Sequence, residues 1–196
     1  MFNLPEPSSP QDYKKHVKYI KTRSQKLPFG PCFASAGWFE GHGYELTVVI
    51  VSRRMPRNRF CFAGYMIDKG CLGLKSTLFR VGYSEEEYKT FVRVMSEREE
   101  RPYEEITVQD AHNLIFGGID YAEDNGFQPM DKDWNITKHL LDERQITDGI
   151  DRIQFGGENG KPLYISGPHD NVEKIIAQLR RRFGEGGFNY VMGGPL

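Results

Sequence analysis

The chain has 196 residues, with 26 Lys+Arg against 27 Asp+Glu and a formal net charge of -1. This length fits one domain with a sizeable core, and the balanced charge excludes a uniformly basic nucleic-acid binder while allowing a local basic surface. Hydrophobic residues at 38% and aromatic residues at 13% exclude a disordered chain. No apolar run approaches the about 18 residues of a membrane-spanning helix, so we expect no membrane partner.

The cysteines and the first ten residues bear on localisation. Cys32, Cys61 and Cys71 are an odd number of thiols in hydrophobic surroundings, which argues against a disulfide framework. Residues 1–10 contain three prolines and no apolar stretch, so we expect no secretory signal. We therefore predict a soluble cytoplasmic protein with reduced thiols, organised as a flexible leader over residues 1–10 and a single domain over residues 11–196.

The first part of the chain reads as one helix followed by strands. A helix is predicted over residues 11–26, capped by a serine just before Pro10, because Tyr13, Val17 and Ile20 share one face. Residues 27–31, with two prolines and a glycine, end it. An antiparallel meander is predicted next, with turns at residues 40–43 and 55–59. Its strands are expected over residues 32–39, 44–51 and 60–67, followed by a bulged or bent strand within residues 71–81.

The second part predicts helices and then a return to strands. Ser84 and Glu87 have the spacing of a capping box, so a helix is expected from there to about residue 99. Further helices are expected from Thr107 to Asn125, where Gly126 follows, and over residues 133–142.

The last part is predicted to form a hairpin, a helix and a strand. A glycine-rich loop separates residues 152–155 from residues 161–165, which we expect to pair as a hairpin. A helix over residues 171–183 and a strand over residues 188–192 follow. The order of elements predicts an α+β fold: an antiparallel β-sheet, made of the meander plus the C-terminal hairpin and strand, with helices packed on it.

Three sequence blocks are similar to those of a group of bacterial hypothetical proteins that have no assigned activity. The blocks are CLGLK at residues 71–75, GF-x-P at residues 126–129 and GKPLY-x-x-GP at residues 160–168. The resemblance implies that the blocks belong to one folded unit, and it carries no catalytic assignment.

A catalytic site is one hypothesis for the interruption of the third strand. Asp68, Cys71 and Lys75 lie together there and could supply a base, a nucleophile and a charge clamp, as in a hydrolase acting on a small molecule. The alternative is structural: Cys71 is a buried small hydrophobe and Asp68 accepts hydrogen bonds from the turn backbone.

Lys161 and His169 are candidates for contacts to an anion. Gly160-Lys161 resembles a phosphate loop, but Pro162 follows without an N–H, so a hairpin turn is favoured. His169 precedes a predicted helix start, where unpaired N–H groups gather, although Asp170 is placed to cap that end itself. The histidines and cysteines lack zinc-ligand spacing, so we predict no metal and no cofactor.

Segregated charge supplies the leading functional hypothesis. Basic residues crowd three segments: the first helix (Lys14, Lys15, Lys18, Lys21, Arg23, Lys26), one hairpin tip (Arg53, Arg54, Arg57, Arg59) and the end of the late helix (Arg180, Arg181, Arg182). If they share one face, with Arg53 and Arg54 as ligand contacts, the protein is an interaction module for nucleic acid, another polyanion or a protein. A solvated surface, paired with the acidic residues 97–105, is the alternative.

Overall fold

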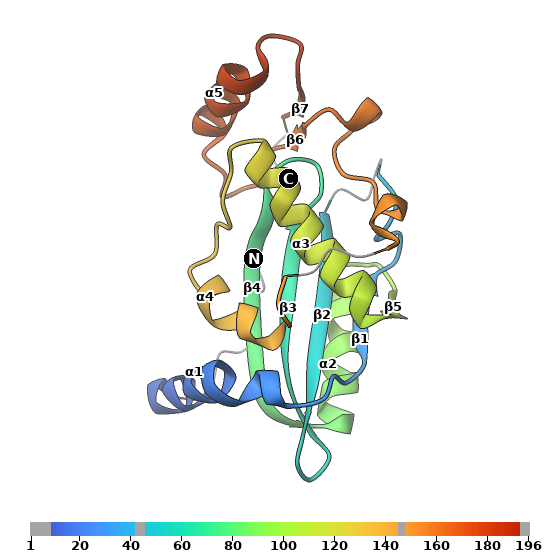
Figure 1. The fold of residues 1–196 in the computed structure, drawn as a ribbon, viewed down its shortest axis with the longest axis vertical. Helices are drawn as coiled ribbons and strands as arrows, with labels where there is room; N and C mark the ends of the chain where they lie inside the picture. The colour runs from blue at the N-terminus through green and yellow to red at the C-terminus, as the bar shows by residue number, and fades with distance from the viewer. Residues whose placement is uncertain (1–8, 42–45, 145–147, 193–196) are drawn as a thin grey trace.

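A five-stranded antiparallel sheet forms the centre of the protein (Figure 1). The computed structural model describes residues 9–41, 46–144 and 148–192. The sheet order is β4-β3-β2-β1-β5, and every neighbouring pair is antiparallel. The strands are β1 (Cys32–Ser35), β2 (Leu46–Met55), β3 (Arg59–Asp68), β4 (Gly73–Ser84) and β5 (Tyr103–Ile106). The predicted α+β class is confirmed.

Helices cover both faces of the sheet (Figure 1). α1 (Pro10–Arg23), α3 (Val108–Asp124) and the one-turn α4 (Trp134–Thr137) lie on one face, and α2 (Glu85–Arg98) lies on the other. β2 shows why both faces are covered: Val49 and Val51 belong to the α3 core, whereas Val48 and Ile50 belong to the α2 core. Side chains of a strand alternate between faces, so apolar residues at consecutive positions need two packed layers.

The predicted helix caps are present. Ser84 and Glu87 form a reciprocal capping box at the start of α2, and Thr107 accepts a hydrogen bond from the Asp110 N–H at the start of α3. Ser9 caps α1 in the same way, accepting from the Asp12 N–H. Asn125 is the C-cap of α3, and the Phe127 N–H donates back to the Ala122 carbonyl at 2.8 Å.

The predicted C-terminal hairpin is wrong. Residues 150–152 form a 3-10 turn, and β6 (Leu163–Ile165) pairs in parallel with β7 (Asn189–Val191) in a separate two-stranded sheet. The backbone donors of this region bond elsewhere: the Gly156 N–H reaches the Lys69 carbonyl at 2.8 Å, and the Leu163 N–H reaches the Gly70 carbonyl at 3.0 Å. The β3–β4 loop therefore takes the hydrogen bonds that a hairpin would have used.

Three other expectations differ from the structure. Residues 36–39 form a turn rather than the end of a strand, and residues 103–106 form β5, which the acidic composition did not suggest. The helix expected over 133–142 is α4 followed by a 3-10 turn at residues 138–140. Residues 42–43 of the turn expected at 40–43 and residues 1–8 of the leader expected over 1–10 lie outside the described residues.

α5 (Val172–Phe183) packs with β6 and β7 as a small unit at one end of the sheet (Figure 1). Its core contains Cys71 and Leu72 from the β3–β4 loop, together with Tyr164 and Leu179. The loop residues thus belong to this core rather than to either sheet face, which joins the C-terminal unit to the sheet.

Two glycines of β4 have positive φ in different surroundings. Gly73 has φ +66°, and a Cβ there would lie 2.6 Å from the Ala122 Cβ and 2.8 Å from the Gly118 carbonyl oxygen on α3. Gly82 has φ +86° and faces open space. Gly73 is therefore required both by its backbone and by the close approach of α3.

We predict that Gly73→Ala destabilises the protein more than Gly82→Ala. The left-handed backbone alone costs about 1–2 kcal/mol in each variant, and the clash with α3 adds about 1–3 kcal/mol at residue 73 only. Urea denaturation of both variants measures the difference. Equal losses would contradict the close packing of α3 on β4.

Candidate functional site

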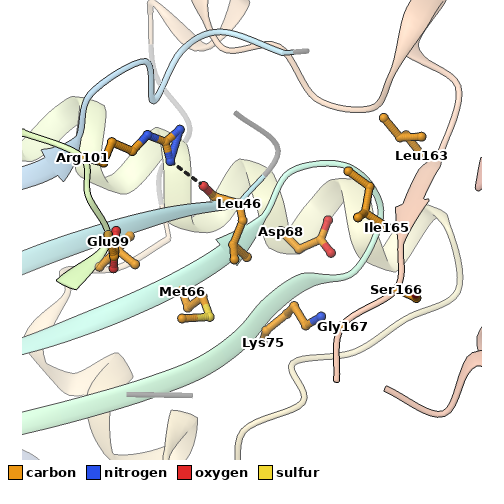
Figure 2. Close-up of a pocket in the computed structure, with 11 residues that line it drawn as sticks. Leu46, Met66, Asp68, Lys75, Glu99, Arg101, Leu163, Ile165, Ser166 and Gly167 are labelled. Carbon is orange, nitrogen blue, oxygen red and sulfur yellow. Dashed lines mark hydrogen bonds between the residues drawn. The ribbon is translucent and has the colours of Figure 1, made fainter. Parts of the chain in front are cut away.

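A cavity of about 440 Å³ lies on the α2 face of the sheet, at the end where β3 turns into β4 (Figure 2). Its apolar lining consists of Leu46, Val48, Met66, Leu163 and Ile165. Its ionisable lining consists of Asp68, Lys75, Glu99 and Arg101, with Ser166 and Gly167 at the margin. The cavity therefore combines apolar walls with a few charged groups.

The strand register places these side chains in one space. Val48 pairs with Met66, and Leu46 pairs with Asp68, so the residues lie on the same face of β2 and β3. α2 ends at Arg98 and leaves this end of the face to Glu99 and Arg101, which follow it. β6 closes the opposite side of the cavity.

Asp68 is held by the loop that follows it. One carboxylate oxygen accepts a hydrogen bond from the Cys71 N–H at 3.0 Å, and the residue is 7% exposed. Burial raises the pKa of Asp68 to about 6, although hydrogen bonds from the loop backbone and the charge of Lys75 lower it. Its pKa therefore lies near neutral pH, in the range that acid–base chemistry uses.

Lys75 reaches the cavity because β4 is bulged there. Met66 pairs with Ser76 and Ile67 pairs with Leu74, so Lys75 is the extra residue and has no partner in the ladder. Its ammonium group lies 2.9 and 3.0 Å from the two Asp170 oxygens. Figure 2 shows Asp68 and Lys75 directed toward the same space.

Asp170 organises this ion pair from the C-terminal unit. Its side chain also accepts hydrogen bonds from the Gly167 N–H at 2.8 Å and from the Tyr164 hydroxyl at 3.3 Å. The cap of α5 is instead Asn171, which accepts from the Lys174 N–H at 3.1 Å. The expectation that Asp170 caps this helix is therefore wrong, because its oxygens are used by Lys75 and the preceding loop.

Glu99 and Arg101 form the third side of the cavity. Burial raises the pKa of Glu99, and the charge of Arg101 offsets part of this. The Arg101 guanidinium donates to the Leu46 carbonyl at 2.8 Å (Figure 2). This contact fixes Arg101 at the edge of β2.

Cys71 does not line the cavity. The residue is fully buried in the core of the C-terminal unit, and burial raises the pKa of its thiol strongly. A protonated, enclosed thiol is not a nucleophile at neutral pH. Of the three predicted catalytic residues, Asp68 and Lys75 both line the cavity, whereas Cys71 lies in the core of the C-terminal unit.

Lys161 and His169 are both exposed and line no part of this cavity. Lys161 donates to the Gly186 carbonyl at 3.3 Å, and His169 lies in the loop before α5. Their role as anion contacts stays a prediction.

Arg53 is buried, and its guanidinium forms hydrogen bonds with groups of the protein itself. Its guanidinium donates to the Leu140 and Leu27 carbonyls, each at 2.9 Å, and to Asp142 at 2.6 Å. It also lies 3.6 Å from the centre of the Phe29 ring, and the residue is 2% exposed. The prediction that Arg53 contacts a ligand is therefore revised: this side chain joins loops to β2.

Arg54 is exposed beside the acidic start of α2. The hydrogen bond from Lys89 chiefly lowers the pKa of Glu85, and the charge of Arg54 also lowers it. Arg59 likewise lies 4.0 Å from Glu87. These hairpin arginines are therefore near carboxylates that reduce their attraction for an anion.

Sequence reasoning missed Glu99 and Arg101, which line the cavity, and the role of Asp170, which pairs with Lys75 beside it. The predicted bulged or bent strand within residues 71–81 was the available signal, because bulges redirect side chains. Glu99 and Asp170 reach this region through contacts between segments that are distant in the sequence, and a local sequence pattern cannot predict such contacts.

Comparisons of the chain with models of protein families, with curated proteins and with solved structures found no match. The resemblance of the CLGLK, GF-x-P and GKPLY-x-x-GP blocks to bacterial proteins thus stays a prediction. Within residues 9–41, 46–144 and 148–192, no helix has the length and apolar character needed to cross a membrane.

Arg53→Ala should destabilise the protein by about 3 kcal/mol, because two buried carbonyls lose a charged donor and Phe29 loses its cation. Arg54→Ala is the matched control and should cost less than about 1 kcal/mol, since Arg54 is exposed. Urea denaturation distinguishes the two. Similar losses in both variants would contradict the structural role of Arg53.

The raised pKa of Asp68 predicts how stability depends on pH. The carboxyl has a pKa of about 6 in the folded protein against 3.8 for an unperturbed aspartate, so the folded state holds its proton more tightly. The contribution of Asp68 to stability therefore falls as pH rises from about 4 to about 6, by roughly 3 kcal/mol in total.

Asp68→Asn should remove this dependence. The free energy of unfolding of the unmodified protein minus that of the variant should decrease across the same interval, as followed by urea denaturation at a series of pH values. A difference that stays constant with pH would show that Asp68 titrates normally.

Proposed function

We propose that the protein binds a small molecule in the cavity, with an apolar body against the aliphatic walls and a cationic group facing Asp68. The observation that carries this proposal is the convergence of Asp68 and Lys75 with apolar residues of β2, β3 and β6 around one space (Figure 2). Of the two classes of function considered from the sequence, this geometry favours the small-molecule class.

The size and lining of the cavity support a ligand of low molecular mass. Its volume of about 440 Å³ is within the usual span of ligand sites, roughly 300–1,000 Å³. Such sites are mostly apolar and have a few placed polar groups. The five apolar side chains and the four ionisable ones follow that composition.

The charges of the cavity favour a cation. Lys75 is paired with Asp170, and Arg101 lies close enough to Glu99 to lower its pKa. Among the described residues, no ion pair joins Asp68 to a cation. The carboxylate of Asp68 is therefore the charge that a ligand ammonium group would neutralise, which favours an amphiphilic amine.

Asp68 is also the group suited to proton transfer in this cavity, because its pKa of about 6 allows both protonation states near neutral pH. A hydrolase activity stays a prediction. In that reaction Asp68 would accept a proton, and Cys71 would not act as the nucleophile.

Methyl-detected NMR with two probes tests the proposal. We expect cyclohexylmethylamine to shift the methyl signals of Met66, Leu163 and Ile165, and uncharged cyclohexylmethanol to bind more weakly. Asp68→Asn should abolish the preference for the amine, about a tenfold effect for one lost charge contact. Glu86→Gln, at an exposed position on α2, is the control and should keep the preference.

Two results would overturn the proposal in different ways. Unperturbed cavity methyls with both probes would exclude the cavity as a site. Equal shifts with both probes in the unmodified protein would support the cavity as a binding site but would contradict its selectivity for amines.

A further inference from the structure

The exposed side of α1 carries cations that the rest of the described chain leaves uncompensated. We define the α1 basic face as the exposed residues Lys14, Lys18 and Lys21 of α1 with Lys26 and Lys138 of the adjoining 3-10 turns. None of these residues takes part in an ion pair among the described residues, whereas Lys15 pairs with Asp12 at 3.5 Å. The face is therefore a concentration of positive charge on a protein of net charge -1.

The packing of α1 holds these cations outward. Ile20 is buried, and Tyr13 and Val17 pack against the same core, so the polar side of the helix faces solvent. The end of the helix is fixed by the Ser24 hydroxyl, which donates to the His139 carbonyl at 2.6 Å. The neighbouring 3-10 turn adds Lys138 to the face.

Lys21 of α1 and Lys138 of the neighbouring 3-10 turn both lie near His139, whose carbonyl accepts from Ser24 at the end of α1. Burial lowers the pKa of His139, and the charges of Lys138 and Lys21 lower it further. Among the described residues, the side chain of Lys138 donates to the neutral Asn135 amide oxygen, at 3.2 Å, and to no carboxylate. Cations gathered on adjacent elements without a carboxylate favour an anionic ligand.

The other basic segments do not extend this face. Arg53 is buried, and Arg59 lies beside Glu87. Arg180 pairs with Glu185 at 2.5 Å, and α5 lies at the opposite end of the molecule from α1 (Figure 1). The three basic segments of the sequence therefore do not converge on one surface, and the α1 basic face is separate from the other two.

We propose that the α1 basic face binds the phosphate backbone of a nucleic acid without reading its sequence. The large exposed hydrophobic residues of the described chain all lie outside α1 and the turn that carries Lys138. A protein interface is usually anchored by buried apolar or aromatic residues, and a membrane-surface helix inserts them into the lipid. A phosphate backbone needs only a series of cations.

Fluorescence anisotropy with a labelled DNA duplex of about 20 base pairs, from about 50 to 200 mM salt, tests this proposal. The variant Lys14→Gln/Lys18→Gln/Lys21→Gln should bind at least about tenfold more weakly at the lowest salt. The slope of log K against log salt should become shallower by about 2–3, since each phosphate contact contributes about 0.9. Glutamine is a good helix former, so α1 should remain folded.

The variant Arg180→Gln/Arg181→Gln/Arg182→Gln is the matched control. It removes the same formal charge from the opposite end of the molecule and should bind within about twofold of the unmodified protein. Thermal melting confirms that both variants are folded. If the first triple variant unfolds, Lys21→Gln alone should still reduce the slope by about 1.

Three outcomes would overturn the proposal. They are no binding by the unmodified protein at the lowest salt, equal weakening in the two triple variants, and tighter binding to phosphatidylcholine–phosphatidylserine vesicles than to DNA. The second would show a response to net charge alone, and the third would indicate a lipid surface.

Discussion

The short loop between β3 and β4 is the constraint on which the arrangement of the protein depends. Asp68 accepts from the Cys71 N–H within this loop, and the loop carbonyls of Lys69 and Gly70 accept from Gly156 and Leu163. Cys71 and Leu72 enter the core of the C-terminal unit. One buried carboxylate thus shapes the loop, the loop positions β6, and β6 closes the cavity. The Lys75–Asp170 pair reinforces the same junction.

The two proposed activities occupy separate parts of the molecule. The cavity lies on the α2 face where β3 meets β4, whereas the α1 basic face lies on the other side of the sheet (Figure 1). Their chemistry also differs, since the cavity presents a carboxylate that forms no ion pair among the described residues, whereas α1 presents ammonium groups. The two proposals are therefore independent, and either site can be present without the other.

Much of the fold is predictable from local pattern, and the functional surfaces are predictable only in part. The caps at Ser84 and Thr107 and the buried stripes of the helices follow from spacing alone, and the interruption after the third strand indicated a bulged or bent strand within residues 71–81. β5 was missed because its exposed glutamates suggest a solvated segment, although β1 supplies its hydrogen bonds. The hairpin failed because the donors of Gly156 and Leu163 bond to the β3–β4 loop.

The distribution of charged residues shows what the sequence determines and what only the tertiary structure determines. By itself the sequence determined that basic residues are segregated and that Tyr13, Val17 and Ile20 turn the lysines of the first helix outward, because helical periodicity is local. Only the tertiary structure decided which cations remain available. It buries Arg53 against distant carbonyls, sets Arg59 beside Glu87 and draws Lys75 to Asp170, because compensation of a charge depends on groups far away in the chain.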